Sequence, residues 1–187
     1  MVGHRIVLTG GGTGGHIYPA LSVAEHLKDD PSVEAILYIG ATGHPEEKLA
    51  RDNGLDFIGL NVSGMPRSLS PRLITWPFQM WSAIERAKEV LRQFKPTVVL
   101  GTGGYASAPP LAAANSLGVP TAVHEPDAHP GLVNRLLSRR AQLVSLGMQG
   151  AAARINAPRG RIVFNGNPVR KSFLAERHRD SGCAILG

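Results

Sequence analysis

Short runs of β-type residues alternate with helical segments from one end of the chain to the other. The runs are too short for helices, and several are apolar throughout, which is typical of strands buried on both faces. We predict strands at residues 5–9, 35–39, 57–60, 97–100, 121–124, 143–146 and 162–164. Helices are expected near residues 19–28, 46–53, 72–94, 108–117 and 131–139. This order predicts an α/β fold with a doubly wound, Rossmann-like parallel sheet, whose ligands bind at the carboxyl ends of the strands.

The composition indicates an ordered protein and excludes an internal disulfide. The 22 glycines and 14 prolines follow no collagen-like or low-complexity period, so we place them in ordered turns. The single cysteine, Cys183, excludes an internal disulfide and favours a reducing, cytoplasmic setting. The sequence has no ligand spacing typical of a metal site, no signal-peptide layout at its start, and no apolar run approaching the roughly 18 residues of a membrane span.

Positive charge is concentrated toward the end of the chain. Residues 1–128 hold 10 basic and 12 acidic side chains, whereas residues 129–187 hold 10 basic and 2 acidic ones. Such a field attracts phosphorylated substrates, anionic lipid headgroups or nucleic acid. Nucleic acid fits least well and we do not expect it as a partner, because only 5% of the residues are aromatic and no nucleic-acid-binding motif accompanies the basic residues.

The first predicted strand leads into a glycine-rich segment, residues 10–16, here called the first glycine loop. Five of its first six residues are glycine, and a helix is expected from about Pro19. Glycines let backbone N–H groups approach an anion, and a helix N-terminus adds partial positive charge, so a phosphate or diphosphate is the expected ligand. A dinucleotide would need an acidic residue after the second strand, and a Walker loop would need a lysine where His16 stands. A purely structural tight turn would not need five glycines.

Two further strand ends carry polar groups. The second glycine loop, residues 101–109, follows the fourth predicted strand and suggests a ligand with more than one polar section. The fifth strand ends with His124, Glu125 and Asp127. A lone His124 would more often be structural, but beside phosphate-binding loops these titratable groups indicate a site.

Four blocks together resemble the N-terminal domain of the MurG glycosyltransferase family. They are the first glycine loop with Tyr18 and Pro19, the second glycine loop, His124 and Glu125 with residues 130–135, and residues 165–170. The blocks occur in family order over nearly the whole chain. The resemblance implies the N-terminal half of a GT-B fold, with residues 1–170 as an acceptor-binding domain and residues 171–187 as a linker and the start of a donor domain.

The resemblance also implies a reaction: inverting transfer of GlcNAc from UDP-GlcNAc to the MurNAc C4 hydroxyl of lipid I, which forms lipid II for peptidoglycan. Neither a metal nor a cofactor is expected. The family continues after the strand that residues 183–187 resemble, so we expect this chain to lack the C-terminal donor domain and to be inactive alone. The alternatives are the acceptor-recruiting subunit of a split GT-B transferase and half of a nucleotide-sugar epimerase.

Carried over residue by residue, the resemblance assigns site residues. His16 is the preferred catalytic base, with Glu125 as a second catalytic candidate and Asp127 as a further rival base. Residues expected near UDP-GlcNAc are Thr13, Gly14, Gly15, Asp127 and Arg170. Those expected near the acceptor are Gly103, Gly104, Tyr105, Ser107 and His124. The family usually has Asn where this chain has Asp127, so the role of that residue is the least determined.

The longest predicted helix, residues 72–94, carries more apolar surface than one core needs. Leu73, Met80, Ile84, Ala87, Leu91 and Phe94 form one stripe that should face the sheet. Ile74, Phe78 and Trp81 point elsewhere, and Arg67 and Arg72 flank the start of the helix. With Arg135, Arg139 and Arg140, this composition predicts a peripheral protein on an anionic membrane, on its cytoplasmic face if the family resemblance holds. The alternative is ordinary core or loop packing of these aromatic side chains.

Overall fold

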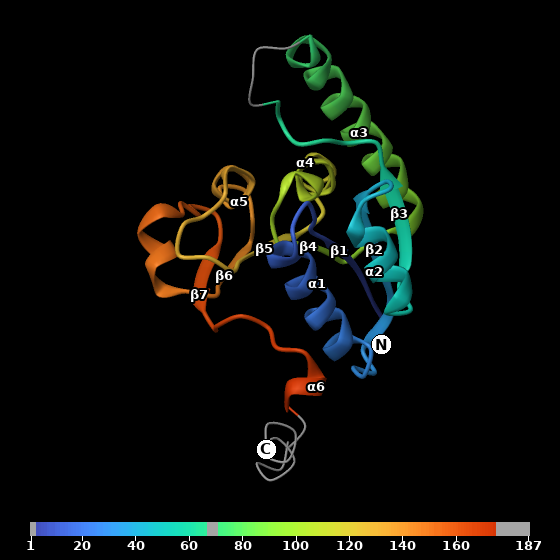
Figure 1. The fold of residues 1–187 in the computed structure, drawn as a ribbon. Helices are drawn as coiled ribbons and strands as arrows, with labels where there is room; N and C mark the ends of the chain where they lie inside the picture. Colours follow the sequence, from blue (N-terminus) through green and yellow to red (C-terminus); the bar gives the residue numbers. More distant parts are fainter. Residues whose placement is uncertain (1–2, 67–70, 175–187) are drawn as a thin grey trace, which may run out of the picture.

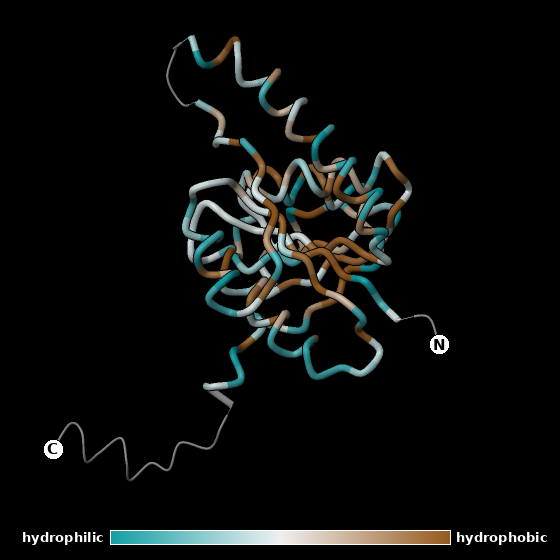
Figure 2. Tube along the Cα trace, turned by 90° about the vertical axis from the view of Figure 1, so that its right-hand side faces the viewer, coloured by the Kyte–Doolittle hydropathy of each residue, from teal (hydrophilic) through white to brown (hydrophobic). Residues whose placement is uncertain are grey.

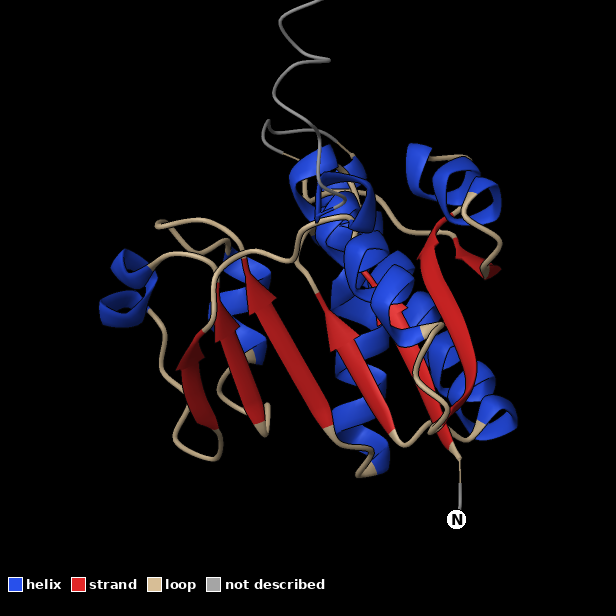
Figure 3. Cartoon of the chain, turned by 90° about the horizontal axis from the view of Figure 1, so that it is seen from below, coloured by secondary structure: helices blue, strands red, loops and turns tan. Residues whose placement is uncertain are grey.

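The computed structural model describes residues 3–66 and 71–174, and its centre is a parallel sheet of seven strands (Figures 1 and 3). The strand order is β3-β2-β1-β4-β5-β6-β7, and every neighbouring pair is parallel. The strands are β1 (His4–Thr9), β2 (Val33–Ala41), β3 (Asp56–Leu60), β4 (Val98–Gly101), β5 (Thr121–Glu125), β6 (Leu143–Leu146) and β7 (Arg161–Phe164). All seven predicted strands and the predicted fold class are confirmed.

The helices follow the predicted order; those predicted at residues 72–94 and 108–117 have the predicted bounds, and the bounds of the others differ. The helices are α1 (Gly14–Leu27), α2 (Pro45–Asp52), α3 (Arg72–Phe94), α4 (Ala108–Leu117), α5 (Leu132–Leu137) and the short α6 (Lys171–Leu174), with 3-10 turns η1 (Tyr105–Ser107) and η2 (Gln149–Arg154). The predicted start of α1 near Pro19 is wrong, because the helix begins inside the first glycine loop and Pro19 lies within it. Proline inside a helix removes one helical hydrogen bond and crowds the carbonyl group four residues earlier, here that of Gly15.

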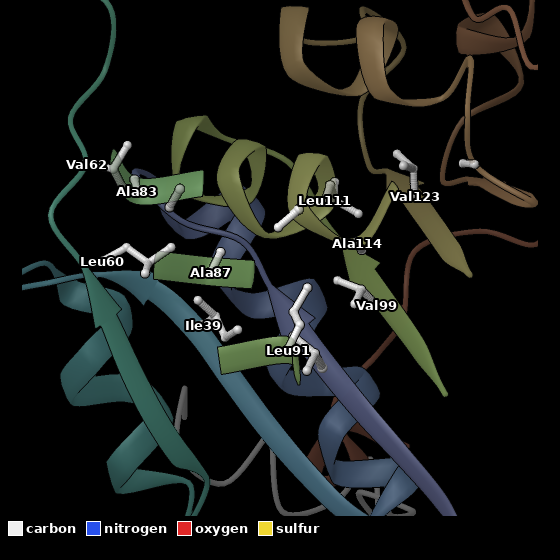
Figure 4. Close-up of a cluster of buried hydrophobic side chains, with 14 of the residues drawn as sticks. Ile39, Leu60, Val62, Ala83, Ala87, Leu91, Val99, Leu111, Ala114 and Val123 are labelled. Carbon is white, nitrogen blue, oxygen red and sulfur yellow. The ribbon is translucent and has the colours of Figure 1, made fainter. Parts of the chain in front are cut away.

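The sheet is buried by helices on both faces, and alternate residues of β1 show this division. Ile6 and Leu8 pack in a core with α1 and α2, whereas Val7 belongs to the core on the opposite face with α3 and α4. Ala83, Ala87 and Leu91 of α3 lie in that second core (Figure 4). The apolar segments of the trace accordingly gather in the interior (Figure 2).

The exposed face of α3 differs from its core face. The first turns of α3 project beyond the body of the sheet (Figure 1). Ile74, Phe78 and Trp81 are 74%, 71% and 65% exposed, so packing in the core is excluded for them. Of the residues predicted to face the sheet, Ala87 and Leu91 are buried in the core. Met80, Ile84 and Phe94 pack against the core but are only partly buried. None of the helices in the described ranges combines the length and apolar character that crossing a bilayer requires.

The chain reverses its direction of winding between β1 and β4, the two adjacent strands at the centre of the sheet. In doubly wound sheets the crevice beyond such a pair is where ligands bind. The first glycine loop follows β1 and the second follows β4, so the fold places both loops at this crevice.

Candidate functional site

The two glycine loops touch through their backbones. The N–H of Gly11 donates to the carbonyl oxygen of Gly103 over 3.3 Å. Beside this contact, the N–H of Thr102 donates to the carbonyl oxygen of Thr9, the last residue of β1, over 2.9 Å. A Cβ atom on Gly104 would lie 1.9 Å from the carbonyl oxygen of Gly11. Gly104 also has φ +78°, a conformation that glycine adopts at little cost. Glycine at this position is therefore required by both contact and conformation.

Four consecutive backbone N–H groups at the start of α1 have no acceptor among the described residues: those of Gly12, Thr13, Gly14 and Gly15. Thr13 is the N-cap residue, and its side chain makes no capping hydrogen bond. All four residues are exposed. Because the first N–H groups of a helix carry partial positive charge, this end of α1 can bind an anion such as a diphosphate.

His16 lies beside these donors with its ring held in one orientation. Its Nδ1 atom is 3.0 Å from the carbonyl oxygen of Thr102. Since a carbonyl oxygen only accepts, Nδ1 carries the proton, and Nε2 of a neutral ring keeps its lone pair. The ring lines the cavity described below. The geometry therefore leaves Nε2 able to take a proton from a ligand.

The ring of Tyr105 packs against the first glycine loop at Gly12. A Cβ atom on Gly12 would lie 2.7 Å from the tyrosine ring, and the hydroxyl of Tyr105 is 3.1 Å from Nδ1 of His44. Burial, with the nearby charge of Glu46, raises the pKa of Tyr105, so its hydroxyl stays protonated at neutral pH. Tyr38 anchors the loop from beneath, donating a 2.7 Å hydrogen bond to the carbonyl oxygen of Gly10.

Glu125 does not line the cavity described below, and its contacts give no support to its assignment as a catalytic candidate. The residue is fully buried. Its Oε1 accepts the N–H of Asp127 at 3.0 Å, and its Oε2 accepts Nδ2 of Asn134 at 2.9 Å and the N–H of Gly131 at 3.3 Å. These bonds hold the segment between β5 and α5, so Glu125 has a structural role here.

His124 and Ser107 are also buried, and a direct contact with an acceptor is not supported for either. The two ring nitrogens of His124 lie 2.8 Å from Ser145 Oγ and 3.1 Å from Asn167 Oδ1. Burial lowers the pKa of His124, and the hydrogen bond to Asn167 offsets this only in part. Ser107 donates to the carbonyl oxygen of Gly104 over 2.9 Å. Ser107 thus stabilises the second glycine loop, whereas His124 links β5 to β6 and to the segment after β7.

The remaining predicted residues do not gather at the glycine loops. Arg170 forms an ion pair with Glu25 at 2.9 Å, near the end of α1 opposite the first glycine loop. Its role toward UDP-GlcNAc stays a prediction without support from this geometry. Asp127 is exposed on the segment after β5, and its role also stays a prediction. Arg67 lies outside the described residues.

A cavity of about 930 Å³ opens beside the first glycine loop and is mostly apolar. Gly12, Thr13, His16 and Tyr105 line one end of it. The other walls come from α3, α4 and α5, with Met65 and Pro66 at one side. Its size lies in the range typical of small-molecule sites, about 300–1,000 Å³.

Sequence reasoning missed two residues that hold the site together. Thr102 accepts the proton of His16 Nδ1 and donates from Oγ1 to the carbonyl oxygen of His16 over 2.5 Å. Asn134 donates to Glu125 and to the carbonyl oxygen of His124, and its amide would lie 3.1 Å from a Cβ atom on Gly103. Asn134 belongs to a block that carried the family resemblance, and its position in that block was the available signal.

Comparison with known proteins finds similarity to glycosyltransferases. The model of the glycosyltransferase family 28 N-terminal domain matches residues 6–145. The UDP-N-acetylglucosamine--N-acetylmuramyl-(pentapeptide) pyrophosphoryl-undecaprenol N-acetylglucosamine transferase of Lactococcus lactis subsp. cremoris is 40% identical over 164 residues, covering 88% of this chain and 45% of that protein. The chain thus spans about half the length of the curated relatives it matches.

Solved structures agree with this comparison. The crystal structure of Acinetobacter baumannii MurG superposes with a TM-score of 0.75 at 25% identity, covering 94% of this chain and 50% of that one. A UDP-GlcNAc 2-epimerase from Neisseria meningitidis, solved with UDP-GlcNAc bound, gives a TM-score of 0.61 at 17% identity, covering 88% of this chain and 47% of that one. The likeness to the epimerase extends to the fold alone.

Proposed function

Because the chain belongs to glycosyltransferase family 28, whose N-terminal domain occupies residues 6–145, we propose that it forms the acceptor-binding part of an N-acetylglucosaminyltransferase. The resemblance to the MurG family is confirmed by the relatives and by the Acinetobacter structure. The proposed reaction is inverting transfer of GlcNAc from UDP-GlcNAc to the MurNAc C4 hydroxyl of lipid I, at the cytoplasmic face of the membrane. Residues 1–170 are the acceptor domain in this proposal; the predicted linker and donor-domain start, residues 171–187, lies outside the described residues from residue 175 onward.

One observation carries the proposal: the free N–H groups of residues 12–15 lie beside His16, which lines an open cavity and whose Nδ1 is held by the Thr102 carbonyl oxygen. Both proposed substrates contain a diphosphate, which the start of α1 can bind. His16 can accept the proton of the attacking hydroxyl as that oxygen bonds to the anomeric carbon. UDP then leaves with the electron pair of the broken glycosidic bond, and N–H donors stabilise its charge. Tyr105 and Gly104 line the cavity, and in this proposal they and the neighbouring Gly103 contact the acceptor.

The proposal requires both substrates to be held together, which sets an expectation for the 187-residue chain on its own. About half of each matched relative has no counterpart in this sequence. Orienting two bound reactants supplies much of the rate of such reactions. We therefore expect the purified chain, incubated with radiolabelled UDP-GlcNAc and a lipid I analogue, to show at most a trace of transfer. Turnover at about 1–100 per second, as for ordinary enzymes, would contradict the proposal that this chain supplies only the acceptor-binding part.

We also propose that the exposed apolar face of α3 rests on an anionic membrane. Ile74, Phe78 and Trp81 recur at a spacing that places them on one side of the helix. Arg72 is exposed at the start of the helix, and Arg135, Arg139 and Arg140 are exposed on and after α5. Apolar side chains flanked by cations are typical of helices that lie in the membrane interface.

Replacing Phe78 and Trp81 together by Ser should reduce sedimentation with vesicles of phosphatidylglycerol by at least about tenfold. The reason is loss of two side chains that would bury apolar surface in the bilayer. Raising salt from low to high ionic strength should weaken binding of the unchanged protein as well. Phe164→Ser is the matched control, because Phe164 is 55% exposed on β7 rather than on α3. A large fall in melting temperature, or equal loss in the control, would contradict the membrane assignment.

A further inference from the structure

The cavity beside the first glycine loop has walls that no step of the proposed chemistry uses. Helices α3 and α5 supply large apolar side chains to it, among them Trp76, Met80, Ile84, Leu132 and Leu136, and α4 supplies the small side chain of Ala112. Leu132 is 63% exposed and Leu136 is 53% exposed. Exposed leucines around one concave surface indicate a binding site, because water contact with such surface is unfavourable.

The polar end of the cavity limits what can occupy it. Gly12 and Thr13 line the cavity with free N–H groups, whereas Gly14 and Gly15 lie outside the lining. No acidic side chain of the described residues lines it. The space therefore complements a molecule with an anionic head and an apolar tail, and a second anion can bind at Gly14 and Gly15 without entering the cavity.

The apolar end leads to the proposed membrane surface. Trp76, Met80 and Ile84 face the cavity from α3. Phe78 and Trp81 are exposed on the same helix. A tail longer than the cavity can thus pass along α3 toward the bilayer. Branched isoprene units suit a pocket of leucine, isoleucine and methionine side chains, which gives close apolar contact without polar partners.

From this geometry we infer that the cavity between α3, α4 and α5 binds the first isoprene units of a polyprenyl diphosphate, with the diphosphate at Gly12 and Thr13. The inference rests on the proposed function and adds to it a site for the lipid part of the acceptor. Its consequence is that the enzyme recognises the start of the lipid chain itself. The membrane contact at Ile74, Phe78 and Trp81 is a separate surface.

Tryptophan fluorescence can test this directly, because the chain has two tryptophans and only Trp76 lines the cavity. In a Trp81→Phe background, Trp76 is the sole reporter. We would titrate the protein with farnesyl diphosphate below its micelle concentration, and with geranyl diphosphate, inorganic diphosphate and farnesol. Farnesyl diphosphate should bind about tenfold more tightly than geranyl diphosphate and at least about 100-fold more tightly than inorganic diphosphate, since each isoprene unit buries further apolar carbon. Farnesol should bind more weakly because it lacks the anion.

Two variants place the binding in the cavity. Leu136→Ser should weaken farnesyl diphosphate about tenfold, and Leu143→Ser, at a leucine 39% exposed on β6, should leave it unchanged. Ala112→Phe provides a second test, since a phenyl ring would fill the cavity without removing any side chain that packs there now. Circular dichroism melts would verify that each variant is folded.

The outcomes that overturn the inference differ from those that overturn the proposed function. Equal affinity for inorganic and farnesyl diphosphate, or unchanged farnesyl diphosphate binding in both cavity variants, would show that the tail does not occupy the cavity. Either result leaves a diphosphate site at the first glycine loop intact. The proposed function fails instead if a complete enzyme carrying this domain transfers no GlcNAc to lipid I analogues of any tail length. If transfer occurs with the same KM for one-unit and three-unit tails, only the cavity assignment fails.

Discussion

In a complete enzyme carrying this domain, His16→Ala is expected to lower kcat by about 10²–10⁴-fold, with a smaller change in KM. That range is the usual contribution of a general base. The physical reason is the hydrogen bond from Nδ1 to the Thr102 carbonyl oxygen, which leaves Nε2 as the basic atom of a ring that lines the cavity. Steady-state kinetics with a lipid I analogue would measure the effect. The pH profile of kcat/KM should also lose the fall in rate at acidic pH, where a base becomes protonated.

Two further variants separate catalysis from structure at His16. His16→Asn can keep a donor toward the Thr102 carbonyl but has no basic nitrogen, so its kcat should fall nearly as far as that of His16→Ala. His26→Ala is the matched control, because His26 is an exposed histidine at the opposite end of α1. Its kinetics should be nearly normal.

Other results would assign a different role to His16. If His16→Ala mainly raises KM, the residue binds the diphosphate instead of taking a proton. Near-normal kinetics with a stability loss of about 0.5–2 kcal/mol would indicate only a role at the helix start. If Asp127→Asn removes the acidic fall in rate and His16→Ala does not, the carboxylate is the base. Glu125→Gln is expected to act through loop stability, because all the observed partners of Glu125 are internal.

Gly104→Ala should destabilise the domain by about 2–5 kcal/mol and abolish most activity of the complete enzyme. A positive φ costs a residue with a side chain about 1–2 kcal/mol, and forced overpacking typically adds about 1–3 kcal/mol. Here the new Cβ would lie 1.9 Å from the Gly11 carbonyl oxygen, so the two glycine loops must separate. For a domain of this size the melting temperature should fall by roughly 5–15 °C, measurable by circular dichroism.

Two other glycines make this prediction specific. Gly118 has φ +72° with open space around it, so Gly118→Ala should show the conformational cost alone, roughly 2–6 °C. Gly131 has neither a positive φ nor a neighbour within 4 Å, so Gly131→Ala should be nearly neutral. A loss in Gly104→Ala no larger than that in Gly118→Ala would show that the loops do not meet as closely as described.

The fold class followed from local patterns in the sequence. Short apolar runs separated by helical segments have few stable solutions other than a parallel sheet covered on both faces, and all seven strands lie where the pattern predicts. The first glycine loop also follows β1 and leads into a helix as predicted, although that helix begins earlier than predicted. The exposed positions of Ile74, Phe78 and Trp81 also followed, from helical periodicity alone.

Local patterns could not show which polar side chains face the crevice. Glu125, His124 and Asp127 occupy the end of one strand, yet the first two are buried in hydrogen bonds to Asn134, Ser145 and Asn167 and only Asp127 is exposed. Arg170 likewise pairs with Glu25, 145 residues earlier in the chain. Such partners are brought together only when distant segments pack. A residue type therefore indicates the chemistry available, and the tertiary structure decides whether that chemistry faces a ligand or holds the protein together.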